Sequence, residues 1–191
     1  MSPLSWFQKA ARQGALQGQK VILRAPEPGD FEAWSALRQK SRGFLEKWEP
    51  TWSPDEFSRF AFRARVRIYD QRARADEGYT FFIFDRKAGA LVGGISLSHV
   101  RRGVSQSATL GYWMGQPFAR QGYMKDAIQT LIRAADASFG LHRLEAACLP
   151  HNEPSRRLLL SCGFQPEGYA KSYVRIAGKW EDHLLFGLVI T

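Results

Sequence analysis

The chain has 191 residues, and its 27 Lys and Arg against 18 Asp and Glu give a formal net charge of +9. This length fits one domain with a full hydrophobic core, and no stretch reaches the roughly 18 apolar residues of a membrane-spanning helix. The positive charge favours polyanions, phosphorylated cofactors or acidic surfaces as partners, and two lone cysteines, Cys148 and Cys162, favour reduced thiols and a cytosolic location.

Residues 1–19 are expected to form an N-terminal extension, and residues 20–191 a single domain. Trp6 and its apolar neighbours follow a near-helical spacing, which Gly14 and Gly18 interrupt. Because this apolar face is brief, we expect the extension to pack on the domain in preference to binding a membrane surface.

The first part of the domain shows a strand and two helices. The run Val21–Ala25 predicts a short strand, and Asp30 is expected to cap a helix to about Gln39. A second helix is expected from Ser53 to about Ala75, with acidic residues in its first turn. Its arginines recur at four-residue spacing, which favours a helix face exposed to solvent over a face that binds phosphate groups. The side chains concerned are Phe31, Trp34 and Leu37 on the first buried face, Phe60, Val66 and Ile68 as apolar partners in the second helix, and the arginines Arg59, Arg63 and Arg67.

Three strands then predict an antiparallel meander. The runs 79–84 and 90–97 form a hairpin pattern, and residues 104–114 supply the next strand. An amphipathic helix is expected over 122–139, and Gly140 is expected to end it in a left-handed cap.

The last part of the chain alternates strand and helix. Residues 143–149 predict a strand, and Asn152 is a good N-cap for the helix that follows. Final strands are expected at about 164–175 and 183–190. This order of elements predicts a mixed α/β fold with an antiparallel front half.

The segment Thr109–Ala127 combines a strand, a tight loop with Gly122 and the start of a helix. This arrangement directs several backbone N–H groups at one place, and the helix dipole adds positive potential there. It therefore predicts an anion site, most simply one for a phosphate group.

Motifs in three parts of the chain can be compared with known families. They are Phe44-Leu-x-x-Trp48-Glu-Pro50; Leu110-Gly-Tyr-x-x-Gly-Gln116 with Gly122-Tyr-Met124; and Arg143…Pro150-His-Asn152-x-x-Ser155 with Gly163-Phe164 and Glu167-Gly-Tyr-Ala-Lys171. In this order and spacing they resemble the GNAT-superfamily N-acetyltransferases, and within these the RimJ/RimL group of ribosomal-protein-alanine N-acetyltransferases, RimJ above all. The resemblance runs from about Val21 to the C-terminus.

The resemblance implies a GNAT fold, with a central, mixed, mostly antiparallel sheet flanked by helices, and an acetyl-CoA site. It places the pyrophosphate on N–H groups of residues 119–124, the pantetheine along residues 112–114 with its amide near Asn152, and the sulfur near Ser155. The implied cofactor-binding residues are Tyr112, Trp113, Met114, Arg120, Gln121, Gly122, Tyr123, Met124, Asn152 and Ser155.

The sequence departs from the family pattern in places. Ala119 and Met124 replace common loop residues, Asp126 replaces a common Glu, and residues 104–114 lack the Glu that serves many relatives as general base. An α-amine with a pKa of about 7.7–8.0 needs only about 1 kcal/mol to lose its proton at pH 7, whereas a lysine amine needs about 5 kcal/mol. The missing base therefore favours an α-amine acceptor.

Acetyl transfer needs a neutral amine, a polarised thioester carbonyl and a proton for the thiolate. Glu49 is the expected base, directly or through water, or else a group that orients the amine. Phe44 and Trp48 are expected to line the substrate pocket with it, unless they are core residues. Ser155 or Tyr169 is expected to protonate the thiolate, with an ordinary structural role for each almost as well supported.

Other groups are weaker candidates. His99 and His183 are alternative bases, although their positions at predicted strand ends favour structural roles. Cys148 could carry an acetyl group, but direct transfer is simpler, because no neighbour in sequence would lower its pKa. No metal-ligand spacing occurs, so no metal is expected.

We therefore expect a cytoplasmic enzyme that acetylates a protein N-terminal amine, with acetyl-CoA as co-substrate and direct attack in a ternary complex. The expected acceptor is the N-terminal alanine of a small-subunit ribosomal protein, and the basic surface suits a weak contact with the ribosome or RNA. Two alternatives remain open: an acetyltransferase for a small-molecule amine, and a non-catalytic module that binds acyl-CoA or RNA.

Overall fold

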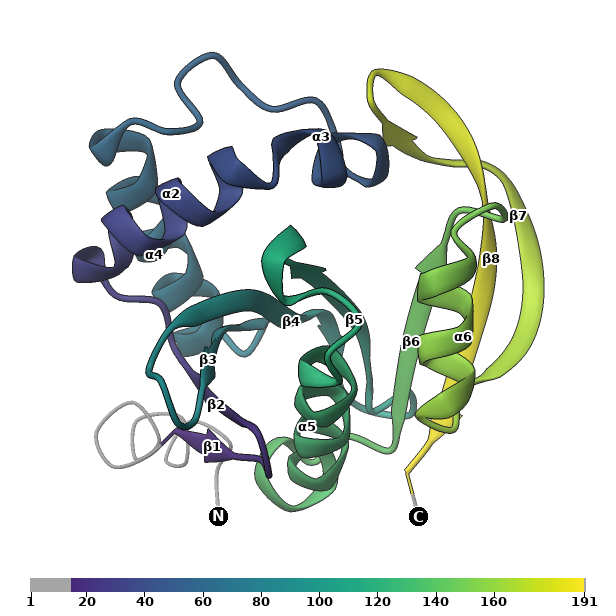
Figure 1. Cartoon of the computed structure of the whole chain (residues 1–191). Helices are drawn as coiled ribbons and strands as arrows, with labels where there is room; N and C mark the ends of the chain where they lie inside the picture. The colour runs from purple at the N-terminus through teal and green to yellow at the C-terminus, as the bar shows by residue number, and fades with distance from the viewer. Residues whose placement is uncertain (1–14, 191) are drawn as a thin grey trace.

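The computed structural model describes residues 15–190 and shows one sheet with helices packed against it (Figure 1). Within these residues eight strands pair in the order β1-β2-β3-β4-β5-β6-β8-β7, and the pairings are antiparallel except between β5 and β6. The expected mixed α/β fold with a mostly antiparallel sheet is confirmed. The elements are β1 (Leu16–Gln17), β2 (Val21–Arg24), η1 (Pro28–Asp30), α2 (Phe31–Lys40), α3 (Arg42–Leu45), η2 (Glu46–Trp48), α4 (Arg59–Arg74), β3 (Tyr79–Asp85), β4 (Leu91–Arg101), β5 (Ser107–Met114), η3 (Gln116–Phe118), α5 (Tyr123–Phe139), β6 (Arg143–Cys148), α6 (Glu153–Ser161), β7 (Gln165–Ile176) and β8 (Lys179–Val189).

The two faces of the sheet carry separate cores. Neighbouring side chains of β3 point to opposite faces. Phe81 therefore joins a cluster that includes Leu131 of α5, whereas Phe82 packs with Trp34 of α2 and Phe62 of α4. This division holds α5 on one face and α2 with α4 on the other.

Helix α5 begins and ends where the sequence predicts. Gly122 precedes it with φ 85°, and Gly140 follows it with φ 55°, both in the left-handed region that favours glycine. Ala127, Ile128 and Leu131 have no exposed surface. The amphipathic pattern thus anchors the helix that starts at the predicted anion site.

Strands β5 and β6 separate after a short parallel pairing. Their last pair joins Thr109 to Glu145, although β5 continues to Met114 and β6 continues in its pairing with β8 up to Cys148. A wedge-shaped gap therefore opens in the middle of the sheet. Backbone groups of β5 that face this gap are not paired with β6.

The predicted start of the second helix is wrong. Helix α4 begins at Arg59, and its N-cap is Ser58, whose hydroxyl accepts the Ala61 N–H at 3.0 Å. Glu56 is buried and pairs with Arg65 at 2.8 Å, so this acid does not lie in the first turn. The predicted apolar partners Phe60 and Ile68 are exposed, whereas Phe62 and Ala73 are the buried residues on this helix.

Other details of the N-terminal half also differ. Asp30 is not bonded to the helix it precedes, because its carboxylate pairs with Arg24 and accepts the Glu27 N–H at 2.7 Å. The unpredicted strand β1 joins the sheet edge by pairing with β2. The expectation for Trp6 and Gly14 falls on residues outside those described.

At the C-terminal end, both final strands are present, but β8 begins at Lys179, earlier than expected. The β7–β8 hairpin curves toward α3 in Figure 1. None of the helices within residues 15–190 has the length and apolar character needed to cross a lipid bilayer.

Candidate active site

The loop between β5 and α5 has the geometry of an anion site. Arg120 and Gly122 have positive φ of 61° and 85°, and α5 starts at the next residue, Tyr123. The Asp126 N–H donates to the Gly122 carbonyl at 3.1 Å. The N–H groups of the first turn before Asp126 thus have no acceptor within the helix. Together with the helix dipole, they favour a bound phosphate.

Lys20 and Asp126, which are not among the predicted cofactor-binding residues, support this loop. Lys20 Nζ donates to the Gln121 carbonyl at 3.0 Å, which adds a cation beside the loop. The buried Asp126 carboxylate accepts the backbone N–H groups of Lys20 at 2.7 Å and Val21 at 3.1 Å. Asp126 therefore ties the start of α5 to the start of β2.

Three polar side chains meet in the gap between β5 and β6. The Tyr112 hydroxyl lies 2.7 Å from Ser155 Oγ, which links β5 to α6. Cys148, at the end of β6, lies near Ser155, whose hydroxyl partly offsets the effect of burial on the pKa of the thiol. Asn152 caps α6 as predicted, because its Oδ1 accepts the Ser155 N–H at 3.2 Å. The Tyr112–Ser155 pair places two hydroxyl groups in the gap, where the family resemblance implies the sulfur of acetyl-CoA.

Burial sets the protonation states of this cluster. Burial raises the pKa of the Tyr112 phenol, and the hydrogen bond with Ser155 offsets only part of this effect. Burial likewise raises the pKa of the Cys148 thiol. Both groups therefore keep their protons well above pH 7, so the Tyr112 hydroxyl is available as a donor and Cys148 is a poor nucleophile.

Tyr169 lies apart from this cluster. It is on the edge strand β7 with 53% of its surface exposed, and its hydroxyl donates to Asp182 Oδ2 at 2.5 Å. Ser155 and Tyr169 are the two residues expected to protonate the thiolate, and of these Ser155 lies in the gap. Its hydrogen-bond partner there is the Tyr112 hydroxyl, a group that sequence analysis did not consider as a proton donor.

A cavity of about 820 Å³ lies against the sheet face covered by α2 and α4. The small residues Gly94, Ser96 and Gly111 line it, and the register places Gly94 opposite Trp113 and Ser96 opposite Gly111. A side chain at position 94 would collide with the Trp113 indole. Because Tyr112 also lines this cavity, it is the candidate pocket for the acceptor amine.

Glu49 lines the cavity and is held by two neighbours. Arg38 donates Nη1 and Nη2 to its carboxylate at 3.2 and 2.5 Å, and Trp52 Nε1 donates at 2.7 Å. Since three donors already use most of its lone pairs, the geometry favours a carboxylate that orients the amine over one that removes its proton. The Ala177 N–H of the β7–β8 turn donates to the Glu49 carbonyl at 3.0 Å, so this hairpin contacts the segment.

The other two predicted pocket residues are half-buried beside Glu49. The Trp48 ring lies 5.6 Å from the ring of His151, which connects this segment to the start of α6. Lys47 Nζ is 5.9 Å from the centre of the Phe44 ring. Neither Phe44 nor Trp48 lines the cavity. Its aromatic lining includes Trp34, Trp52 and Trp113, whose side chains sequence analysis did not assign to this pocket.

The two histidines differ in their positions. His183 is 5% exposed, and its Nδ1 lies 3.0 Å from the Glu181 carbonyl oxygen, which gives it a structural role. His99 lines the cavity, and its Nδ1 lies 3.2 Å from Ser98 Oγ. Within residues 15–190, no group of three or more His, Cys, Asp or Glu side chains is arranged to hold a metal ion.

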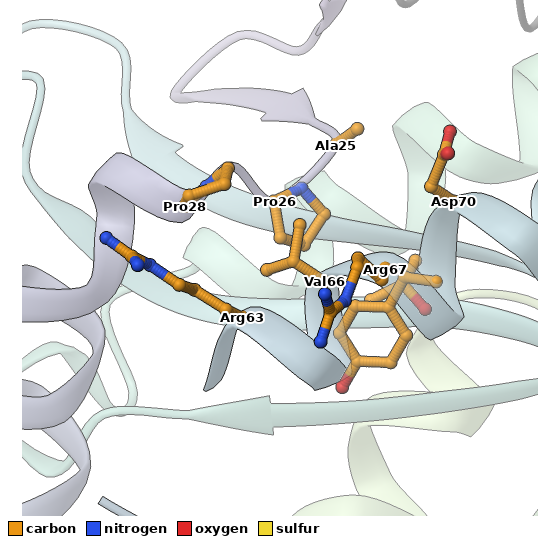
Figure 2. Close-up of a pocket in the computed structure, with 9 residues that line it drawn as sticks. Ala25, Pro26, Pro28, Arg63, Val66, Arg67 and Asp70 are labelled. Carbon is orange, nitrogen blue, oxygen red and sulfur yellow. The ribbon is translucent and has the colours of Figure 1, made fainter. Parts of the chain in front are cut away.

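A second cavity, of about 540 Å³, lies between the segment after β2 and helix α4 (Figure 2). Arg63 and Arg67 line it together with apolar side chains such as Pro26 and Val66. Arg59, the third arginine of the predicted solvated face, instead pairs with Glu32 outside this cavity. The arginines of this helix face therefore have two different environments: Arg59 forms an ion pair, and Arg63 and Arg67 line the cavity.

Comparison with known proteins shows the family to which this chain belongs. The sequence matches the acetyltransferase (GNAT) domain over residues 20–165. The chain belongs to the GNAT acetyltransferase family. It is therefore an acyltransferase, and the gap in its sheet lies beside the loop predicted to bind the pyrophosphate of acetyl-CoA.

Relatives of this acetyltransferase cover most of its length. The ribosomal protein uS5-alanine N-acetyltransferase of Escherichia coli (strain K12) is 33% identical over 161 residues, 83% of this chain and 83% of that protein. The S5-alanine acetyltransferase of Vibrio fischeri has a TM-score of 0.85 at 26% identity, over 92% of this chain and 96% of the other. Mycobacterium smegmatis RimJ, solved in complex with CoA-disulfide, has a TM-score of 0.84 at 31% identity, over 88% of this chain and 81% of the other. A relative with bound CoA supports acetyl-CoA as the co-substrate.

Proposed function

We propose that this acetyltransferase transfers the acetyl group of acetyl-CoA to the N-terminal α-amine of a ribosomal protein, with the N-terminal alanine of a small-subunit protein as the expected acceptor. The observation that carries the proposal is the Tyr112–Ser155 pair at 2.7 Å in the sheet gap, on a strand that also lines the cavity containing Glu49. The relatives that act on alanine of uS5 support this choice of acceptor.

Acetyl-CoA would bind along the loop and the gap. Backbone N–H groups of residues 120–124 would hold the pyrophosphate, and Lys20 lies beside the loop to balance its charge. The pantetheine would run along β5 residues 112–114, which have no partner on β6. The side-chain amide nitrogen of Asn152 is available to it, because the cap uses only Oδ1.

The proposed chemistry is direct transfer between two bound substrates. The amine nitrogen attacks the thioester carbonyl carbon, the new C–N bond forms, and the C–S bond breaks. Tyr112, which burial keeps protonated well above pH 7, protonates the thiolate directly or through Ser155, and the phenolate then regains a proton from water. The proton that leaves the amine passes to water. No acyl-enzyme is involved, since the Cys148 thiol is kept neutral by burial.

An α-amine suits this site better than a lysine side chain. Strand β5 carries no Glu to act as a base, so the acceptor must lose its proton with little help. That loss costs about 1 kcal/mol for an α-amine at pH 7 and about 5 kcal/mol for lysine. The proposed acceptor places the reaction in the cytoplasm, and the net charge of +9 suits a weak contact with the ribosome or RNA.

The proposal is tested by CoA release with paired peptides. One peptide begins with a free Ala, and its matched control has the α-amine blocked but keeps an internal lysine. Release with the first alone is expected. Release only with the control, or only with small amines, would refute the proposed acceptor. Binding of acetyl-CoA without any release, together with salt-sensitive RNA affinity, would instead indicate a non-catalytic module.

A further inference from the structure

Arg38 of α2 is buried in the wall of the acceptor cavity, and neither the sequence motifs nor the chemistry above assigns it a role. It is 6% exposed. The centre of its guanidinium lies 4.5 Å from the ring centre of Trp52, 5.0 Å from Trp113 and 5.9 Å from Trp34. Three indole rings therefore surround one cation, at distances where cation–π attraction is effective.

Arg38 connects two carboxylates. Its Nη1 and Nη2 bond to Glu49 at 3.2 and 2.5 Å, and its Nη2 lies 3.9 Å from Glu56. Glu56 in turn forms a two-pronged pair with Arg65, at 2.9 and 2.8 Å. Charges of alternating sign thus run from the segment after η2 to helix α4.

Stability alone does not explain this arrangement. Arg38 Nε is buried, and no acceptor lies within hydrogen-bond distance of it among the described residues. A buried donor without an acceptor is costly, and buried ion pairs rarely stabilise a fold more than apolar packing would. The geometry that Arg38 imposes on Glu49 offers a better explanation.

Glu49 is fixed from several directions. The Arg38 fork restrains both carboxylate oxygens, Trp52 Nε1 bonds to Oε2, and the Ala177 N–H holds the Glu49 carbonyl. The bond that Oε1 receives from Arg38 is the longer one, at 3.2 Å, and a carboxylate oxygen can accept a second donor. Glu49 therefore keeps an acceptor site in the cavity while its orientation is set.

We infer that Arg38 is a positioning residue, which holds Glu49 as an oriented carboxylate that binds the protonated amine of the acceptor. This inference rests on the proposed role of the cavity as the acceptor pocket. The acceptor enters as its abundant ammonium form, donates an N–H bond to Glu49, and loses one proton to water before it attacks.

The test compares two Arg→Lys variants of the same chain of ion pairs. Arg38→Lys keeps the charge but loses the fork on Glu49. We expect KM for an Ala-peptide to rise on the order of tenfold, as charge pairs at recognition sites predict, with kcat and KM for acetyl-CoA little changed. Arg65→Lys is the matched control, because its fork holds Glu56 and does not touch Glu49. A clearly smaller rise in peptide KM is expected for it, and equal rises in both variants would overturn the inference.

A second measurement separates positioning from a general loss of structure. Because Arg38 acts through Glu49, Glu49→Gln and the double variant Arg38→Lys/Glu49→Gln should have the same peptide KM. Additive increases would contradict the inference. Should Arg38→Lys fail to fold, binding of a free-amine peptide and its N-acetylated form to the CoA-bound wild type remains decisive. We expect binding to weaken roughly tenfold on acetylation, and equal binding would overturn the role of Glu49.

Failure of the proposed acceptor is distinguishable from failure of this inference. An enzyme that acetylates only a small amine would refute the ribosomal-protein acceptor. The Arg38→Lys and Arg65→Lys comparison would then use that amine, which is also a cation at neutral pH, with the same two outcomes.

Discussion

Replacing Tyr112 by Phe removes the hydroxyl proposed to protonate the CoA thiolate and keeps the aromatic ring. The hydroxyl lies 2.7 Å from Ser155 Oγ, and burial raises its pKa, so the wild-type group carries its proton throughout the neutral range. The ring packs against the main core cluster. Tyr112→Phe should therefore change the chemistry more than the fold.

The size of the effect follows from these contacts. General acid catalysis contributes typically about 10²–10⁴-fold. Because Ser155 remains at the gap, we expect a loss near the lower end, about 10²-fold in kcat, or about 2.7 kcal/mol of transition-state stabilisation. The lost hydrogen bond should cost about 1 kcal/mol of unfolding free energy, which corresponds to about 2–4 °C in Tm for a chain of this size.

The assay is steady-state release of CoA, detected with a thiol reagent, at saturating acetyl-CoA and Ala-peptide. Ser155→Ala should show at least a roughly tenfold loss. The double variant Tyr112→Phe/Ser155→Ala should have a kcat only slightly below that of the less active single variant, because the two hydroxyl groups act as a unit. Tyr169→Phe is the comparison for the exposed hydroxyl on β7, and a loss below about threefold is expected, because Tyr169 bonds to Asp182 outside the gap. A Tyr112→Phe enzyme with near wild-type kcat, or a larger loss in Tyr169→Phe, would refute the reasoning.

Three further predictions concern the loop and the cluster around it. Asp126→Ala removes the acceptor of the N–H groups of Lys20 and Val21 and should lower the free energy of unfolding by about 3 kcal/mol, seen as a fall in Tm of about 6–12 °C; an unchanged Tm would show that the β1–β2 turn does not need it. Gly122→Ala places a Cβ on a residue with φ 85°, and calorimetric titration should show acetyl-CoA binding weakened by about fivefold, the equivalent of about 1 kcal/mol of left-handed strain; unaltered affinity would mean that the loop adjusts. Since burial raises the pKa of the Cys148 thiol, its alkylation at pH 8 should be at least about tenfold slower in the folded enzyme than in urea, and similar rates would contradict a neutral, enclosed thiol.

Elements defined by local chemistry could be predicted from the sequence. Helix α5 lies between two glycines in the left-handed conformation, and Asn152 caps α6 through a residue three positions away. These glycine and capping signals depend only on residues within a few positions of each other in the sequence. The loop that starts α5 is recognisable for the same reason, because Gly122 and the helix start alone predict an anion site there.

Contacts between distant elements could not be predicted in this way. Glu56 has the local appearance of a first-turn acid, yet its partner Arg65 draws it into a buried pair and delays the start of α4. Tyr112 and Ser155 are 43 positions apart and meet only because β5 and β6 diverge at the gap. Arg38 has no motif of its own, and its importance depends on Glu49, 11 positions away.

The central claim is acetyl transfer to a protein α-amine, and tandem mass spectrometry of one peptide tests it most directly. The peptide begins with Ala, carries an internal lysine and is incubated with acetyl-CoA at pH 7. The account predicts one acetyl group on the α-amine of Ala, with release of an equal amount of CoA. An acetyl group found on the lysine alone would contradict it.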